Sequence, residues 1–274
     1  MTKLKLALCQ MNVIDNKLEN LKKASSMISD ASKKVDFVVL PEMFNCPYSN
    51  DKFIEYSEDE NDSYTLNKIS NLARENNIYI LAGSIPEKKE DKLFNTSYLF
   101  DKHGEIIAKH RKMHLFDIDV KDKITFKESD VLTAGNEFTL ADTEFGKIGI
   151  GICYDIRFPE LARIMVENGA LILFYPGAFN MTTGPAHWQL LFRSRALDNQ
   201  VYCVGVAPAL NEDASYHSYG HSIITNPWGE VLAEADQKEE IILCEIDLDE
   251  IKKVREELPL LKNKRKDLYE VIEK

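Results

Sequence analysis

Cys153 lies where a predicted strand gives way to a predicted helix. The run from Gly146 to Ile152 alternates isoleucine with glycine, which favours a buried strand that packs closely. Helical apolar spacing follows from about Phe158 to Val166. A side chain at such a corner is accessible, and the adjoining backbone N–H groups can face a developing negative charge. The alternative interpretation is a buried structural cysteine, but the polar residues that follow this cysteine favour chemistry.

Glu42 and Lys112 also follow predicted strands, and both carry groups that suit a cysteine nucleophile. Glu42 comes directly after the apolar run 36–40, and Lys112 lies in the run 109–116. A carboxylate beside a thiol can act as a general base and return the proton to a leaving amine. An ammonium favours the thiolate and stabilises an oxyanion. Together the three groups suit attack on an amide or nitrile carbon, whereas each charge alone is more typical of a solvated surface.

The elements that must position these side chains are alternating helices and strands, with hairpins in places. Residues 3–10 alternate as a strand, and Asp15 or Asn16 can cap the helix that follows. Turn sequences at 101–104 and 226–229 predict two hairpins. This mixture predicts an α/β fold in which helices cover large sheets, in one domain over residues 1–274. The candidate residues follow strands, where α/β folds place their sites.

Composition excludes several classes of function. The chain has 274 residues and a formal net charge of −11, which argues against a nucleic-acid-binding surface. No run approaches the roughly 18 apolar residues of a membrane span, and the N-terminus resembles a strand rather than a signal peptide. The five cysteines include no C-x-x-C pair, which suits a reducing compartment. We therefore expect a cytoplasmic protein with no nucleic-acid or membrane partner.

Three motifs resemble the signatures of the nitrilase superfamily of carbon–nitrogen hydrolases. They are Pro41-Glu42, the run His110-Arg-Lys-Met-His-Leu-Phe116 and the run Gly151-Ile-Cys-Tyr-Asp-Ile-Arg-Phe-Pro-Glu160. The resemblance extends almost from end to end. It implies a four-layer αββα sandwich, a homodimer, a small-molecule amide substrate, and a catalytic triad of Glu42, Lys112 and Cys153 that needs no cofactor.

The finer resemblance is to the omega-amidase branch. Tyr154-Asp155, where true nitrilases carry Trp-Glu, resembles the amidase branches in general, and the match to omega-amidases rests on the runs 116–119, 124–129, 175–188, 193–200 and 226–229. It implies hydrolysis of the terminal amide of α-ketoglutaramate or α-ketosuccinamate, which yields 2-oxoglutarate or oxaloacetate and ammonia. Three alternatives stay open: a deaminated-glutathione amidase, an acyltransferase that passes the thioester to an amine, and a non-catalytic scaffold that keeps the fold.

The resemblance and the local chemistry extend the candidate site. Glu128 resembles the additional glutamate of the family, which positions the lysine or the substrate; its alternative is a surface charge. The backbone N–H of Tyr154 is the expected partner of Lys112 in holding the oxyanion. Arg157 is a candidate clamp for the substrate carboxylate, and the alternative is a structural ion pair with Asp155 or Glu160.

The remaining candidates concern substrate binding. Thr183 can add a hydroxyl donor, and Tyr48, Phe116 and Phe179 are candidates for the pocket wall, although aromatic side chains more often belong simply to the core. The histidines show no metal-ligand spacing, so we expect no metal site.

Overall fold

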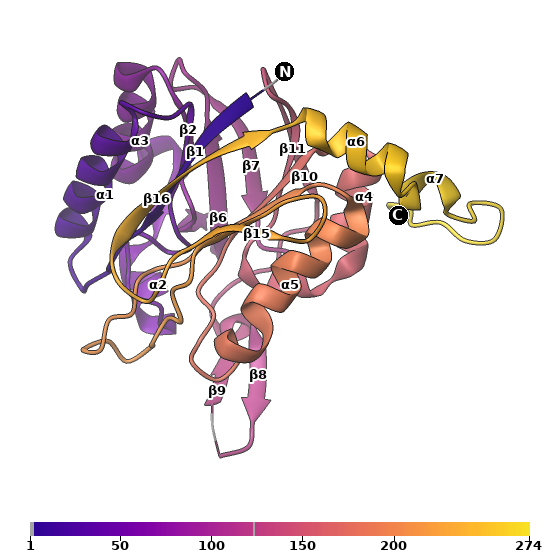
Figure 1. The fold of residues 1–274 in the computed structure, drawn as a ribbon. Helices are drawn as coiled ribbons and strands as arrows, with labels where there is room; N and C mark the ends of the chain where they lie inside the picture. Colours follow the sequence, from indigo (N-terminus) through magenta and orange to yellow (C-terminus); the bar gives the residue numbers. More distant parts are fainter. Residues whose placement is uncertain (1–2, 123) are drawn as a thin grey trace.

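The computed structural model describes residues 3–122 and 124–274, and its centre is a pair of β-sheets stacked face to face (Figure 1). The first sheet has the strand order β16-β1-β2-β4-β6-β5-β3, and β7 also pairs with β6. Its strands are β1 (Lys3–Gln10), β2 (Phe37–Val39), β3 (Glu58–Asp59), β4 (Tyr79–Leu81), β5 (Ile85–Lys89), β6 (Lys92–Phe100), β7 (Ile106–Arg111) and β16 (Glu240–Asp247).

The second sheet has the order β10-β11-β12-β13-β14-β15, in which β11, β12 and β13 run parallel. A separate hairpin, β8–β9, projects from the body of the molecule (Figure 1). These strands are β8 (Asp117–Val120), β9 (Ile124–Lys127), β10 (Thr139–Thr143), β11 (Gly146–Ile150), β12 (Ile172–Pro176), β13 (Tyr202–Val206), β14 (Ile223–Thr225) and β15 (Val231–Glu234).

Helices form the two outer layers. The α-helices are α1 (Lys17–Ala31), α2 (Asn50–Tyr56), α3 (Tyr64–Asn76), α4 (Pro159–Glu167), α5 (Gly184–Asn199), α6 (Asp249–Glu257) and α7 (Leu260–Asn263). In the part of the chain that the structure describes, the connections also contain the short 3₁₀-helices η1 (Glu60–Asp62), η2 (Glu128–Asp130) and η3 (Cys153–Arg157). Apolar clusters join α1 and α3 to the first sheet and α4 and α5 to the second. The four-layer αββα sandwich that the resemblance implied is confirmed.

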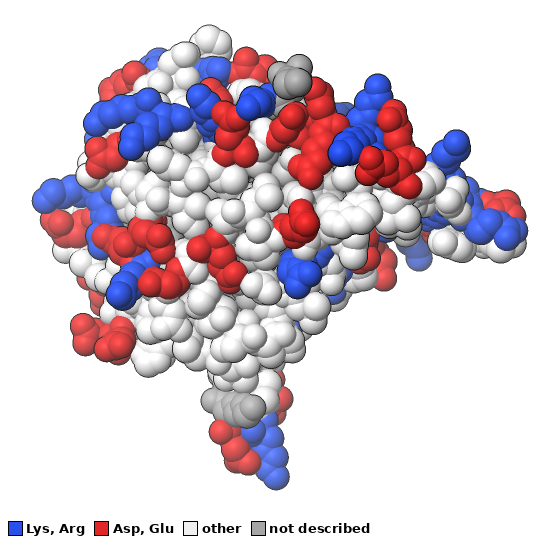
Figure 2. Space-filling view, viewed as in Figure 1, with Lys and Arg blue, Asp and Glu red and all other residues white. Residues whose placement is uncertain are grey.

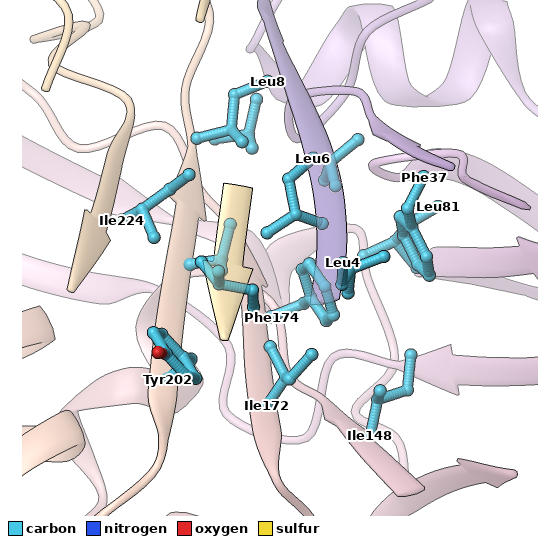
Figure 3. Close-up of a cluster of buried hydrophobic side chains, with 14 of the residues drawn as sticks. Leu4, Leu6, Leu8, Phe37, Leu81, Ile148, Ile172, Phe174, Tyr202 and Ile224 are labelled. Atoms are coloured by element: carbon cyan, nitrogen blue, oxygen red, sulfur yellow. The ribbon is translucent and has the colours of Figure 1, made fainter. Parts of the chain in front are cut away.

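The alternation in β1 explains how one strand serves two layers. Leu4, Leu6 and Leu8 point into the core between the sheets, while Ala7 and Cys9 pack under the first helical layer (Figure 3). Across the inter-sheet core, the rings of Phe37 and Phe174 stack with centroids 5.0 Å apart. Side chains from both halves of the chain therefore share one core.

Two predicted element boundaries are refined by the structure. Asn16, one of the two predicted caps, accepts a hydrogen bond from the Glu19 N–H at 3.1 Å, so it starts α1. The apolar and polar spacing from His187 to Asn199 predicts a helix, and α5 begins three residues earlier, at Gly184, because Pro185 is tolerated in a first turn. Among the described residues, no helix is long and apolar enough to cross a membrane.

Candidate active site

Cys153 lies at a strained corner directly after β11, at the first position of η3. Its φ of +48° is in the left-handed region, which non-glycine residues rarely adopt. Two glycines let the neighbouring backbone come close: a Cβ on Gly151 would lie 2.5 Å from the Tyr175 ring, and one on Gly177 would lie 3.2 Å from the Cys153 Cα. The predicted strand-to-helix corner is confirmed.

The structure brings together the three side chains that the sequence placed after separate strands. Lys112 Nζ donates to Glu42 Oε1 at 3.0 Å, and the Glu42 carboxylate lies close enough to the Cys153 thiol for each group to shift the pKa of the other. Glu42 and Lys112 are completely buried, and Cys153 is 3% exposed. An acid, an ammonium and a sulfur therefore meet at one point where water is largely excluded.

Glu128 joins this cluster through the same ammonium. Its Oε1 accepts from Lys112 Nζ at 2.8 Å and from the Tyr48 hydroxyl at 2.6 Å, and its Oε2 accepts from the Phe116 N–H at 2.7 Å. Glu128 is completely buried, so the alternative of a surface charge is wrong. Three donors fix this carboxylate, which is a second acceptor that holds Lys112 in place beside Glu42.

Two donors to Glu42 were not found by sequence reasoning. Asn95 Nδ2, on β6, donates to Oε1 at 2.8 Å, and the backbone N–H of Ala178 donates to Oε2 at 2.7 Å. A polar amide within a strand is only a weak sign that Asn95 belongs to the site, and a main-chain donor cannot be recognised from the side-chain type. With Lys112 these groups orient both oxygens of Glu42.

The charge balance of the cluster decides where its protons lie. Burial raises the pKa of Glu42 and the charge on Glu128 raises it further, although Lys112 opposes the shift. Burial also raises the pKa of the Cys153 thiol, and Glu42 adds to this effect. Burial alone lowers the pKa of Lys112, but the two carboxylates outweigh it and the net shift is upward. Lys112 therefore remains an ammonium, and the resting thiol needs Glu42 to accept its proton.

Arg157 presents a guanidinium that is not paired with a carboxylate. Its Cζ lies 4.6 Å from the Phe179 ring centroid and 5.6 Å from that of Tyr154, and Nη1 lies 3.1 Å from His187 Nδ1. Across residues 3–122 and 124–274, no carboxylate lies within ion-pair distance of it, and its buried Nε has no hydrogen-bond partner. The alternative of a structural ion pair is therefore wrong.

Asp155 is held by other partners, which explains why that ion pair does not form. Its Oδ2 accepts from the Ile152 N–H at 2.9 Å and lies 3.0 Å from His110 Nε2. Its Oδ1 accepts from the His114 N–H at 3.0 Å and lies 2.7 Å from His114 Nδ1. Burial would raise the pKa of Asp155, but these partners lower it well below the usual range. The carboxylate thus ties η3, which begins with Cys153, to His110 on β7 and to His114 just after β7.

The other substrate-binding candidates differ in how closely they contact the catalytic cluster. Tyr48 does more than line a wall, because its hydroxyl bonds Glu128 and accepts from Lys112 at 3.3 Å. The Phe116 ring packs edge-on against the Tyr154 ring, with centroids 5.3 Å apart. The Arg157 guanidinium lies over the Phe179 ring. The Thr183 hydroxyl lies 3.3 Å from Asn180 Oδ1, at the start of α5. Within the described residues, no group of three or more histidine, cysteine, aspartate or glutamate side chains is arranged so that it could hold a metal ion.

Comparisons with known proteins agree with this architecture. The profile of the carbon–nitrogen hydrolase family matches residues 5–256. The omega-amidase NIT2 of Bos taurus is 50% identical over 272 residues, which covers 99% of this chain and 98% of the relative. Omega-amidase NIT2-A of Xenopus laevis is 50% identical over 275 residues, covering 100% and 99%.

A solved structure extends the agreement to three dimensions. Saccharomyces cerevisiae Nit3, described as a member of branch 10 of the nitrilase superfamily, superposes with a TM-score of 0.89 at 45% identity, covering 96% of this chain and 97% of that one. With a family profile spanning most of the sequence and relatives alike over its whole length, the chain belongs to the carbon–nitrogen hydrolases of the nitrilase superfamily.

Proposed function

We propose that the chain is an omega-amidase, which hydrolyses the terminal amide of small 2-oxo acid amides such as 2-oxoglutaramate and 2-oxosuccinamate. The observation that carries this proposal is the convergence of Glu42, Lys112 and Cys153 beside the unpaired guanidinium of Arg157. Relatives that are about half identical over nearly the whole chain are named omega-amidases, which supports the same activity.

The acylation half-reaction uses all three groups. Glu42 takes the thiol proton, and the Cys153 sulfur attacks the amide carbon. The oxyanion that forms is held by the Lys112 ammonium and the Tyr154 N–H, which lies in the first turn of η3 and so has no partner within that helix. Glu42 then gives its proton to the departing amine, the C–N bond breaks, and ammonia leaves a thioester on Cys153.

Deacylation reverses the direction of proton transfer. A water molecule loses a proton to Glu42 as its oxygen attacks the thioester carbon, and the sulfur leaves and recovers that proton. A cavity of about 40 Å³ adjoins Glu42, Tyr48 and Ala178. It is large enough for a water molecule. The dicarboxylate product then dissociates.

The 2-oxo acid end of the substrate needs a cationic partner. Arg157, four residues after the nucleophile, is free to bind a carboxylate through two parallel hydrogen bonds. Thr183 supplies a hydroxyl, and Phe116 and Phe179 enclose the aliphatic part. Tyr48 acts from the opposite side by fixing Glu128 and Lys112.

A substrate panel with one arginine variant tests this assignment. Ammonia release is measured with 2-oxoglutaramate, deaminated glutathione and a neutral amide such as butyramide. In Arg157→Lys the KM for 2-oxoglutaramate should rise roughly tenfold or more, because a lysine cannot form the bidentate pair, while that for the neutral amide changes little. Arg163→Lys is the matched control, since the Arg163 guanidinium bonds the Asp198 carbonyl. An equal rise in KM for both amides would mean that Arg157 has a structural role and does not bind the substrate carboxylate. Faster turnover of deaminated glutathione than of 2-oxoglutaramate would identify the chain as a deaminated-glutathione amidase.

We also propose that two copies of the chain form a homodimer, each a single domain spanning residues 1–274. Figure 2 shows charges of both signs around a broad uncharged area over α5 and β15. Four large apolar side chains are exposed there, namely Leu190, Leu197, Trp228 and Leu232. A second copy that covers this area should give twice the chain's mass in light scattering, and the mass of one chain contradicts the proposal.

The five unpaired cysteines support a cytoplasmic location.

A further inference from the structure

Tyr216 reaches into the active site from the connection between β13 and β14. Its neighbours Ser215 and His217 are exposed, whereas its own hydroxyl donates to the Ala178 carbonyl at 2.5 Å. Its ring lies 4.6 Å from the Tyr48 ring, tilted by 32°, and 6.1 Å from the Phe126 ring. The Tyr216 side chain thus links the connection between β13 and β14 to the active site.

Ala178 links this anchor to the general base. Its N–H donates to Glu42 Oε2 at 2.7 Å while its carbonyl accepts from Tyr216, so the residue is held on both of its peptide units. The residue before it is Gly177, which adds backbone freedom at this point. The flanking peptides have other partners, since the Gly177 N–H donates to the Val206 carbonyl at 2.9 Å, so the Tyr216 hydroxyl is the group that holds the Ala178 carbonyl itself.

The phenol remains a donor over the working range of pH. Burial raises the pKa of Tyr216, and the nearby Cys153 and Glu42 raise it further, so the hydroxyl keeps its proton. The orientation follows, because a protonated hydroxyl facing a carbonyl oxygen can only donate.

We propose that Tyr216 is a positioning residue for the general base: through the Ala178 peptide it fixes the N–H that orients the second oxygen of Glu42. This inference rests on the proposed function, since it assigns Tyr216 to the proton transfer between Cys153 and Glu42. The side chain of Tyr216 takes no part in bond making.

Tyr216→Phe removes the hydroxyl and keeps the ring on Tyr48. A less firmly placed N–H stabilises the Glu42 carboxylate less, so the Glu42 pKa should rise further and the acid-side inflection should move to higher pH. We expect this shift both in kcat/KM for 2-oxoglutaramate and in the rate at which iodoacetamide alkylates Cys153. The kcat should fall roughly tenfold, with a smaller change in KM, as for the loss of one oriented hydrogen bond.

Two further variants complete the test. Tyr216→Leu also lacks the hydroxyl, so it must move the inflection in the same direction. Tyr219→Phe is the matched control, because the Tyr219 ring stacks on His221 in the same connection and bonds the site only through its backbone. Thermal unfolding of each variant verifies that it is folded. If both Tyr216 variants keep the inflection of the wild type, the proposal is overturned.

Alkylation separates this inference from the proposed function. Iodoacetamide reads the reactivity of Cys153 without any amide substrate. If the wild-type protein releases no ammonia from 2-oxo acid amides, the omega-amidase proposal fails, yet a shifted alkylation profile in Tyr216→Phe still supports the positioning role. If ammonia is released and the alkylation profile is unchanged, only the role of Tyr216 fails.

Discussion

Glu42 and Asp155 are both fully buried carboxylates beside Cys153, and their pKa values move in opposite directions. Burial acts on both in the same sense, so burial does not account for the difference. Asp155 contacts two histidine rings and two backbone N–H groups at 2.7–3.0 Å. Glu42 has the buried carboxylate of Glu128 nearby, and both share the single ammonium of Lys112.

This difference separates a structural anion from a general base. Two carboxylates and one ammonium leave the Glu42 cluster with an excess negative charge, so Glu42 gains by accepting the thiol proton. Both oxygens of Asp155 are already bonded to donors, so protonation would break favourable contacts and the carboxylate stays ionised. Two carboxylates in one site therefore have different roles, and the nearby negative charge of Glu128, which acts on Glu42, separates them.

The largest test of this comparison is Cys153→Ala. If the Glu42 cluster exists to move the thiol proton, removing the thiol should lower ammonia release by at least about 10³-fold, while the Asp155 contacts keep the fold. Ammonia release and the urea midpoint are measured together. Cys244→Ala is the matched control, because Cys244 lies partly exposed on β16. A wild-type rate in Cys153→Ala would show that Cys153 is not the nucleophile and that Glu42 does not act as its general base.

The sequence predicts the side-chain members of the site better than the donors that orient them. Glu42, Lys112 and Cys153 follow strands whose apolar patterns are clear, so their convergence is foreseeable once the strands form sheets. The N–H of Ala178, 136 residues from Glu42, is a main-chain group and leaves no trace in residue type.

Long-range contacts also explain why the alternative of an ion pair between Asp155 and Arg157 is wrong. Charge and spacing suggest Arg157 as its partner, two residues away, but the actual partners His110 and His114 are 45 and 41 residues away. Local patterns identify elements and their ends, whereas the choice among partners depends on how the two sheets pack. Tyr48 illustrates the same limit, because its hydroxyl bonds Glu128, 80 residues away.

The smaller test is Asp155→Asn, which acts on the structural member of the pair. An amide can accept only through one atom, so some of the four donors lose their partner, and the free energy of unfolding at neutral pH should fall by roughly 2–4 kcal/mol. Urea unfolding measures the change. The control is Asp142→Asn, whose side chain is 88% exposed and should change stability by less than about 0.5 kcal/mol.

The pH dependence of that difference distinguishes a charge effect from a packing effect. The folded pKa of Asp155 lies below its unfolded value, so its ionised form contributes stability that is fully present above the ordinary aspartate pKa of about 3.9 and is lost as pH falls through the folded pKa. The gap between the wild type and Asp155→Asn should therefore be constant from about pH 5 upward and narrow below about pH 4. A gap that is the same at pH 3 and pH 7 would mean that shape, and not charge, holds the corner that carries Cys153.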